Sequence, residues 1–221
     1  MTDLFKTFID FLLHIDIYLQ HWVTDYRTWT YAILFIIIFC ETGLVVTPFL
    51  PGDSLLFATG TIAAMENQPL SIVFVIPLLI CAAFIGDNNN YFVGRFLGIA
   101  VYERDYRLIK KEYLIKTHSF YEKHGGKTLI IARFMPIIRT FAPFVAGVGT
   151  MKYFRFLSFS AIGNVLWVTL FSLTGYFFGN IPLIKKNFTI AILGIIFISL
   201  LPMIIAIIKK YMDQHKERRN K

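Results

Sequence analysis

The chain has 221 residues, of which 56% are hydrophobic. Its mean hydropathy of +0.61 is too high for a water-soluble domain, so the composition excludes a soluble protein and indicates an integral membrane protein. The formal net charge of +8 is informative only through the places where the lysines and arginines lie.

The first 27 residues mix charged and apolar side chains. The stretch LFKTFIDFLLHIDIYLQHW places Lys6, Asp10 and His14 among apolar residues at helical spacing. This pattern predicts a helix over residues 1–27 that lies at the membrane interface. The segment lacks the basic start and the small-residue cleavage site of a signal peptide, so we expect it to be retained.

Four stretches are apolar enough, and long enough, to cross about 30 Å of hydrocarbon as helices of roughly 20 residues. They are Trp29 to Val46, Asn67 to Gly86, Phe156 to Ile184 and Asn187 to Ile208. The last two carry no charged residue, whereas the first contains Glu41. We therefore expect one membrane domain over residues 28–208, followed by a basic tail over residues 209–221.

The positive charges give an expected orientation. Lysines and arginines cluster between Arg104 and Lys127 and again from Lys209 onward, whereas the connection around Asp53 and Glu66 has none. The positive-inside rule places both basic segments, including the carboxyl terminus, in the cytoplasm. Basic residues beside a membrane usually orient the protein or contact anionic lipid, so we expect no nucleic-acid partner.

Two further apolar segments, 47–64 and 127–149, are too short to cross the membrane and return as full helices. Proline and glycine interrupt them at Pro48, Pro51, Gly52, Pro136, Pro143 and Gly147. Broken backbone survives at membrane depth only where protein or a water-filled cavity satisfies its polar groups, so both segments are predicted to be re-entrant hairpins.

The predicted topology makes one hairpin enter from the periplasmic face and the other from the cytoplasmic face. That is the pattern of an inverted repeat, in which a hairpin and two spans recur upside down. Identity between the halves is limited to short matches, such as YFVG from Tyr91 and YFFG from Tyr176. The expected fold is therefore an all-α polytopic membrane protein with about four spans and two opposed re-entrant hairpins.

Arg133 and Arg139 both lie in the second hairpin. A charge at the bilayer centre costs about 2.5 to 3.5 kcal/mol on insertion scales, so charged residues at this depth are candidates for function. One interpretation is structural, with salt bridges to Glu41 and Asp53. The other is a grip on phosphate, because the planar guanidinium matches phosphate oxygens and a broken helix adds the positive end of its dipole. We favour the phosphate interpretation.

Glu41 and Asp53 are candidates for proton coupling. A low-dielectric environment favours the neutral form of a carboxyl group and a neighbouring arginine favours the ionised form, so such a group can change protonation as its surroundings alternate. Asp53 could instead act as the N-cap of a helix, whereas Glu41 lies within a span and has no such role. Asp87, which precedes Asn88 to Asn90, could line a cavity or close the end of a span.

A membrane enzyme such as a lipid phosphatase is the alternative from another class, and a scaffold with structural ion pairs is a third. An enzyme would need a nucleophile beside a base, or a base positioned on a water. Neither hairpin contains His or Cys, and Ser54 has no evident basic partner. Cys40 and Cys81 fall inside predicted spans, where they behave as small hydrophobes, so we expect neither a metal site nor a cofactor.

The stretches CETGLVVTPFLPGDSLLF and FYEKHGGKTLIIARFMPIIRTFAPFVAG, together with Gly163, Trp167 and Gly175, resemble the bacterial DedA family. The resemblance covers nearly the whole chain, and RFMPIIRTFAP is its most specific element. The family's essential acids and arginines match residues named above: Glu41, Asp53, Arg133 and Arg139.

Several DedA proteins are linked to the recycling of undecaprenyl phosphate across the bacterial inner membrane, and distant relatives with the same domain are eukaryotic lipid scramblases. The resemblance therefore implies a multi-pass inner-membrane flippase for an anionic lipid or polyprenyl phosphate, coupled to protons. It names a class of lipid rather than one lipid. Such a protein could act as a homo-oligomer.

Overall fold

The computed structural model describes residues 15–44, 52–65, 70–103, 125–149, 151–179, 181–182 and 194. Every regular element within these ranges is an α-helix, which confirms the all-α class. The helices are α2 (Ile15–Tyr26), α3 (Trp29–Gly43), α4 (Gly52–Ala63), α5 (Ile72–Glu103), α7 (Lys127–Ala132), α8 (Pro136–Val148) and α9 (Tyr153–Phe178).

Two helices are long and apolar enough to cross a membrane. Their apolar stretches are Ile72–Leu97 in α5 and Tyr153–Phe178 in α9, each of 26 residues. At about 1.5 Å per residue, each extends about 39 Å, which exceeds the hydrocarbon thickness of about 30 Å. Helix α3 is shorter, at 15 residues. The predicted span Asn187 to Ile208 and the basic tail lie outside the described residues, apart from Gly194, so four spans stay a prediction.

The predicted end of the second span at Gly86 is wrong. Helix α5 continues through Asp87 and the three asparagines to Glu103. Polar side chains usually mark the end of a membrane helix because lipid cannot satisfy them. Here they face other helices, and Asp87 and Asn90 are 1% and 0% exposed, so the helix can continue.

The amino-terminal part of the chain packs on the helical core. Helix α2, which lies inside the predicted helix over residues 1–27, contacts α3 and α4. Its Leu19 and Val23 are fully buried against these neighbours. Residues 1–14 lie outside the described residues, and the interfacial position of this helix stays a prediction.

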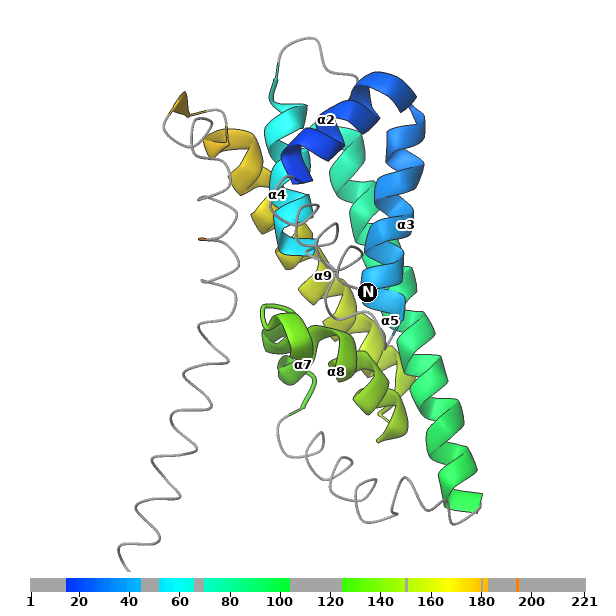
Figure 1. The fold of residues 1–221 in the computed structure, drawn as a ribbon. Helices are drawn as coiled ribbons and strands as arrows, with labels where there is room; N and C mark the ends of the chain where they lie inside the picture. Colours follow the sequence, from blue (N-terminus) through cyan, green and yellow to red (C-terminus); the bar gives the residue numbers. More distant parts are fainter. Residues whose placement is uncertain are drawn as a thin grey trace, which may run out of the picture.

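Figure 1 shows α4 beside the upper part of α9, and α8 beside α5 in the lower half of the molecule. Both shorter helices begin near the middle of the molecule and run outward toward opposite ends. The second predicted hairpin consists of two helices, α7 and α8, with a break between them, whereas only the second arm of the first predicted hairpin lies among the described residues. The entry of these hairpins into the membrane from opposite faces stays a prediction.

The two contacts between short and long helices use the same device. In each, a glycine on one helix meets a backbone carbonyl of the other, and a Cβ atom at that glycine would overlap the carbonyl. The glycines are Gly60 and Gly175 between α4 and α9, and Gly147 and Gly94 between α8 and α5. This reciprocal pattern supports the inverted repeat. In the packing, Gly94 of α5 has the same role as Gly175 of α9. The sequence match of YFVG with YFFG instead aligns Gly94 with Gly179.

Two apolar clusters form the core. The first includes Leu79, Ala83 and Trp167. The second includes Tyr91 and Phe156. Asp87 and Asn90 on α5, and Ser160 and Asn164 on α9, lie between the members of these two clusters. The core is therefore divided by a polar layer.

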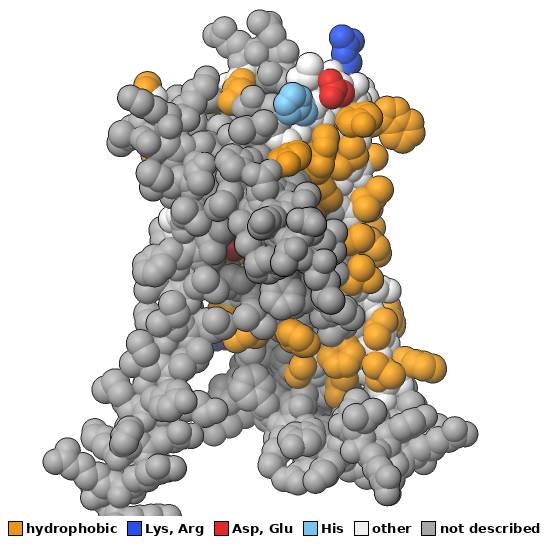
Figure 2. All heavy atoms as spheres, in the orientation of Figure 1, with side chains coloured by type: hydrophobic (Ala, Val, Ile, Leu, Met, Phe, Trp, Pro, Cys, Tyr) orange, Lys and Arg blue, Asp and Glu red, His pale blue; other side chains and the backbone are white. Residues whose placement is uncertain are grey.

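The exposed surface of the long helices is apolar. Val73, Phe74 and Phe96 on α5 are each at least 70% exposed. Figure 2 shows such side chains along most of the right-hand edge of the molecule, with the charged side chains visible on that edge gathered at its upper end. An apolar band of this height is typical of a surface that contacts lipid.

Candidate functional site

Arg139 on α8 joins two carboxylates from two other helices. Its Nη2 donates to Oε1 of Glu41 at the end of α3, and its Nη1 donates to Oδ1 of Asp53 in the first turn of α4. The three side chains are 3%, 0% and 9% exposed, in the order Arg139, Glu41, Asp53. The ions therefore neutralise one another away from water, as the salt-bridge interpretation expected for this arginine.

The start of α4 adds to this cluster. The backbone N–H of Gly52 donates to Oε1 of Glu41 at 3.1 Å. A Cβ atom at this position would overlap the Glu41 carboxylate, so a larger residue there would force Glu41 to move. The amino end of a helix carries unpaired N–H groups and a partial positive charge, and both Glu41 and Asp53 lie beside this end of α4.

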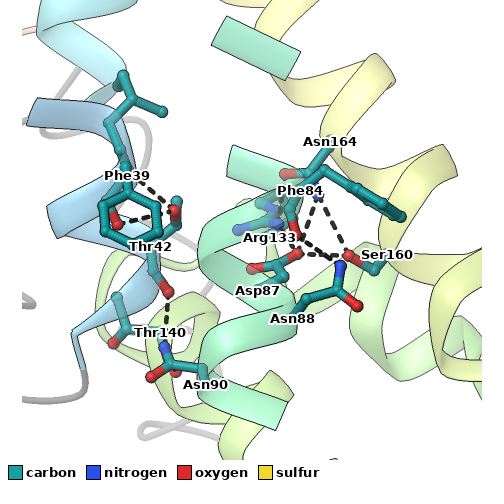
Figure 3. Close-up of polar contacts among 11 residues, drawn as sticks. Phe39, Thr42, Phe84, Asp87, Asn88, Asn90, Arg133, Thr140, Ser160 and Asn164 are labelled. Carbon is teal, nitrogen blue, oxygen red and sulfur yellow. Dashed lines mark hydrogen bonds and ion pairs between the residues drawn. The ribbon is translucent and has the colours of Figure 1, made fainter. Parts of the chain in front are cut away.

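Arg133 belongs to a different cluster, and its partner is neither Glu41 nor Asp53, the two acids that the structural interpretation offered. It follows the last residue of α7, and its Nη2 donates to Oδ2 of Asp87 and to Oδ1 of Asn164. Oδ2 of Asp87 also accepts from Ser160 Oγ at 2.5 Å and from Asn164 Nδ2 at 2.9 Å. Figure 3 shows these side chains converging from α5, α9 and the end of α7. Asp87 is thus the partner of an arginine on a helix that continues past it, and its place in the lining of a cavity stays a prediction.

Trp167 on α9 connects the two clusters. The Cζ atoms of Arg133 and Arg139 lie 5.5 Å and 5.0 Å from its ring centroid, within the range of a cation–π interaction. Its Nε1 donates to Oδ1 of Asp53 at 2.8 Å. The sequence contained one signal for this role: tryptophan is enriched at the two ends of membrane helices, and this one lies well inside a span.

The three asparagines after Asp87 tie the helices together around the charges. Asn89 Nδ2 donates to the carbonyl of Gly43 at 2.8 Å. Asn90 Nδ2 donates to the carbonyl of Thr42 at 2.6 Å and, on α8, to that of Thr140 at 3.2 Å (Figure 3). The last carbonyls of a helix have no partner within it, so the asparagines cap α3. Asn90 holds the residues that directly follow Glu41 and Arg139.

Asn88 completes this set of contacts. Its Nδ2 donates to the carbonyl of Phe84 at 2.7 Å, and its Oδ1 accepts from the hydroxyl of Tyr153 on α9 at 2.8 Å. The run therefore links α5 to α3, α8 and α9. Sequence reasoning left these residues without a role, because their partners are backbone carbonyls brought together only by folding.

The predicted helix breakers have different roles. Pro136 begins α8 after an extended Met135, as expected where a proline follows a break. Pro143 and Gly147 lie inside α8, so their assignment as breakers is wrong. A proline removes one N–H donor without ending this helix, and Gly147 instead permits close packing on α5. Pro48 and Pro51 lie outside the described residues.

The buried charges are unequal in number. Among the described residues, the buried ionisable groups are the three carboxylates of Glu41, Asp53 and Asp87 and the two guanidiniums of Arg133 and Arg139. One nitrogen of each guanidinium, Arg133 Nη1 and Arg139 Nε, is buried without a hydrogen-bond partner. Each arginine therefore keeps a donor that an incoming anion could use. No group of three or more His, Cys, Asp or Glu in the described part of the chain is arranged to hold a metal ion.

Two apolar helices are long enough to cross a bilayer, their exposed surface is largely apolar, and a layer of paired ions is buried between them and the shorter helices. These features define an all-helical membrane protein with a charged centre. Residues 50–177 match the family model of the VTT domain. The chain is 53% identical over 208 residues to protein DedA of Escherichia coli strain K12, covering 94% of this chain and 95% of that protein. It therefore belongs to the DedA family, as the sequence motifs predicted.

Two more distant relatives extend the comparison. The chain is 43% identical over 188 residues to the uncharacterized membrane protein Rv0364 of Mycobacterium tuberculosis strain H37Rv, covering 85% of this chain and 81% of that protein. It is 33% identical over 176 residues to inner membrane protein YqjA of Escherichia coli strain K12, covering 75% and 78%. The comparison with solved structures found no match. These relatives agree with the assignment of the chain as a membrane protein.

Proposed function

We propose that this protein moves a phosphate-headgroup lipid carrier, such as undecaprenyl phosphate, between the leaflets of the bacterial inner membrane, and that protons drive or permit the movement. One observation carries the proposal: two buried guanidiniums lie against the same tryptophan ring, and each retains a nitrogen that contacts no acceptor. The name of inner membrane protein YqjA supports the location.

Phosphate suits this centre for reasons of geometry and charge. A guanidinium presents several N–H donors in one plane and binds phosphate oxygens through two of them at once. Arg139 lies in the first turns of α8, where the amino end of the helix also favours an anion. Arg133 lies at the adjoining break between α7 and α8. Both arginines can therefore contribute to one headgroup site.

The excess of carboxylates supports the coupling to protons. With all five buried groups ionised, three carboxylates against two guanidiniums leave one net negative charge. A phosphate would add further negative charge to a buried site, which is costly without compensation. Protonation of Glu41 or Asp53 would remove this charge and release donors of Arg139 at the same time. Headgroup binding and proton uptake would then favour each other.

The two opposed half-helices suggest a route. In transporters built from inverted repeats, a site between broken helices is exposed alternately to the two sides of the membrane. The amino ends of α4 and α8 both lie near the charged centre, and each helix runs outward along a different long helix (Figure 1). Alternating access to this centre, with a cytoplasmic carboxyl terminus, completes the proposal.

Leaflet exchange in reconstituted vesicles tests it. The full chain would be incorporated into phospholipid vesicles that carry a fluorescent polyprenyl phosphate, and the outer-leaflet label would be bleached by an impermeant reductant. We expect bleaching beyond the outer-leaflet fraction for the phosphate lipid and not for the matching polyprenol. Arg139→Gln should abolish the exchange, whereas Arg95→Gln, which removes an exposed arginine of α5, should not.

The remaining outcomes identify the alternatives. Release of inorganic phosphate from the probe would indicate a lipid phosphatase, although no hydrogen bond reaches Oγ of Ser54 among the described residues. If the folded protein gives neither exchange nor phosphate release, the ion pairs are those of a scaffold and the proposed function is wrong.

A further inference from the structure

The ion pair between Arg133 and Asp87 has an unusual geometry for a permanent structural bridge. The side chains are 4% and 2% exposed, yet only Nη2 of the arginine contacts the carboxylate, and only Oδ2 of the carboxylate accepts. Arg133 Nη1 and Asp87 Oδ1 are both buried without a hydrogen-bond partner. A structural arginine–carboxylate pair in a dry interior usually gains its strength from two parallel hydrogen bonds, which this pair lacks.

Two neutral donors beside Asp87 would remain in contact with its carboxylate if Arg133 moved away. Ser160 Oγ and Asn164 Nδ2 donate to the same Oδ2 atom at 2.5 Å and 2.9 Å. Asn164 Nδ2 also lies 3.2 Å from Ser160 Oγ, which holds the two donors together. If Arg133 moved away, these neutral donors would remain on the carboxylate. A buried carboxylate left with no donor would be far more costly.

We propose that Asp87 is the resting counter-ion of Arg133 and that an incoming phosphate group displaces it. The inference rests on the proposed function and adds a specific residue to its site. A phosphate can engage Nη1 and a second donor of Arg133 together, whereas Asp87 engages a single nitrogen. The exchange therefore replaces a one-nitrogen contact with a two-nitrogen contact. Asp87 acts as a competitor that keeps smaller or weaker anions from occupying Arg133.

The two arginines differ in how firmly carboxylates hold them. Arg139 is held through two nitrogens by two carboxylates, while Arg133 is held through one nitrogen by one carboxylate and one amide. Arg133 also follows α7 directly at the break before α8, so its position depends on a short segment of irregular backbone. Arg133 is thus the arginine that a headgroup would meet with the weaker opposing contact.

Binding to the full chain in a neutral detergent tests the proposal. The probes are farnesyl monophosphate, inorganic phosphate and farnesol, measured by calorimetric titration. Asp87→Asn removes the competing charge and retains an oxygen and a similar shape. We expect it to bind farnesyl monophosphate about tenfold more tightly, comparable to the loss of one competing charge-assisted hydrogen bond. Farnesol should not bind more tightly.

Two further variants isolate the cause. Asp25→Asn raises the net charge equally but at an exposed position on α2, and it should leave the affinity unchanged. Combining Asp87→Asn with Arg133→Gln should remove the gain in affinity, because the guanidinium for which Asp87 competes is then absent. If Asp87→Asn does not fold, Asp87→Ser, which keeps an oxygen and leaves room for a water, is titrated in its place.

The outcomes separate this inference from the proposed function. A gain with farnesyl monophosphate alone supports displacement by a lipid headgroup, and an equal gain with inorganic phosphate supports displacement by phosphate from either source. If the wild-type protein binds farnesyl monophosphate and the folded variant binds it equally or more weakly, Asp87 is structural and only this inference is overturned. If neither protein binds a phosphate probe, the proposed function and this inference are both wrong.

Discussion

Replacing Arg139 with lysine tests whether the planar fork of the guanidinium matters. Arg139 uses two separate nitrogens to reach Glu41 and Asp53, which come from different helices. Lysine keeps the positive charge but has one nitrogen on a flexible stem, so it cannot hold both carboxylates in the same geometry. The variant should lose one charge-assisted hydrogen bond, at about 1.5 to 3 kcal/mol. At about 2 to 4 °C per kcal/mol for a chain of this size, the Tm should fall by about 3 to 12 °C.

Thermal unfolding in detergent, followed by tryptophan fluorescence, measures this change. Arg95→Lys is the matched control, because Arg95 is an exposed residue that donates to the Tyr91 hydroxyl at 3.2 Å, outside the charged centre, and its Tm should change little. Combining Arg139→Gln with Asp53→Asn should recover part of the stability that Arg139→Gln loses, since one carboxylate is no longer stranded. An Arg139→Lys protein with an unchanged Tm and unchanged binding of farnesyl monophosphate would refute the argument for the fork.

Three other changes test separate parts of the structure. Glu41→Gln keeps the shape of the side chain but cannot titrate, so leaflet exchange should stop or lose its response to a pH gradient, and normal gradient-driven exchange would make Glu41 structural. Gly94→Ala should cost about 1 to 3 kcal/mol in thermal unfolding, because its Cβ atom would overlap a carbonyl of α8. At Gly163 an added Cβ atom would lie 3.6 Å from its nearest neighbour, Ile130 Cα, so Gly163→Ala should be neutral or slightly stabilising. A cysteine near Glu66 should react with an impermeant thiol reagent in intact cells stripped of their outer membrane, and one near Glu112 should not; the reverse would invert the topology.

The helices and the identity of the charged residues could be predicted from the sequence. Long apolar runs have few alternatives to membrane helices, and burying an ion is costly enough that Glu41 and Arg139 were expected to have partners or functions. Their meeting across 98 positions of sequence follows the salt-bridge interpretation. The helical class and the burial of these charges are confirmed because they depend on length, polarity and the cost of burying charge, whereas the phosphate interpretation that we favoured for the arginines stays a prediction.

The contacts that each buried polar residue makes could not be predicted from the sequence. Asp87 was interpreted from its position after a long apolar run, which usually indicates the end of a span. In the folded protein Asn90 donates to two backbone carbonyls, one of them Thr42 O at 2.6 Å, and Asp87 pairs with Arg133. These tertiary contacts replace the water that the polar groups would otherwise need. The role of Trp167 was indicated only by its position well inside a span, because a tryptophan in an apolar helix otherwise resembles ordinary core until the two arginines are placed beside it.

The charges are divided between the two halves of the chain. Within the described ranges, the three buried carboxylates belong to α3, α4 and α5, and the two buried arginines belong to the segment of α7 and α8. Each ion pair among them therefore joins the first half of the chain to the second. The glycine contacts also cross between the halves, because α4 packs on α9 and α8 packs on α5.

This division links the ion pairs to movement. If the halves shift relative to each other, the glycine contacts can slide between backbones, but the ion pairs must break, because each has one member on either side. A buried ion separated from its partner is costly, so such a shift requires a replacement for the missing charge. A proton can neutralise a carboxylate of the first half, and a phosphate can pair with an arginine of the second. The same two ligands that the proposed function requires are thus the ones that would allow the halves to separate.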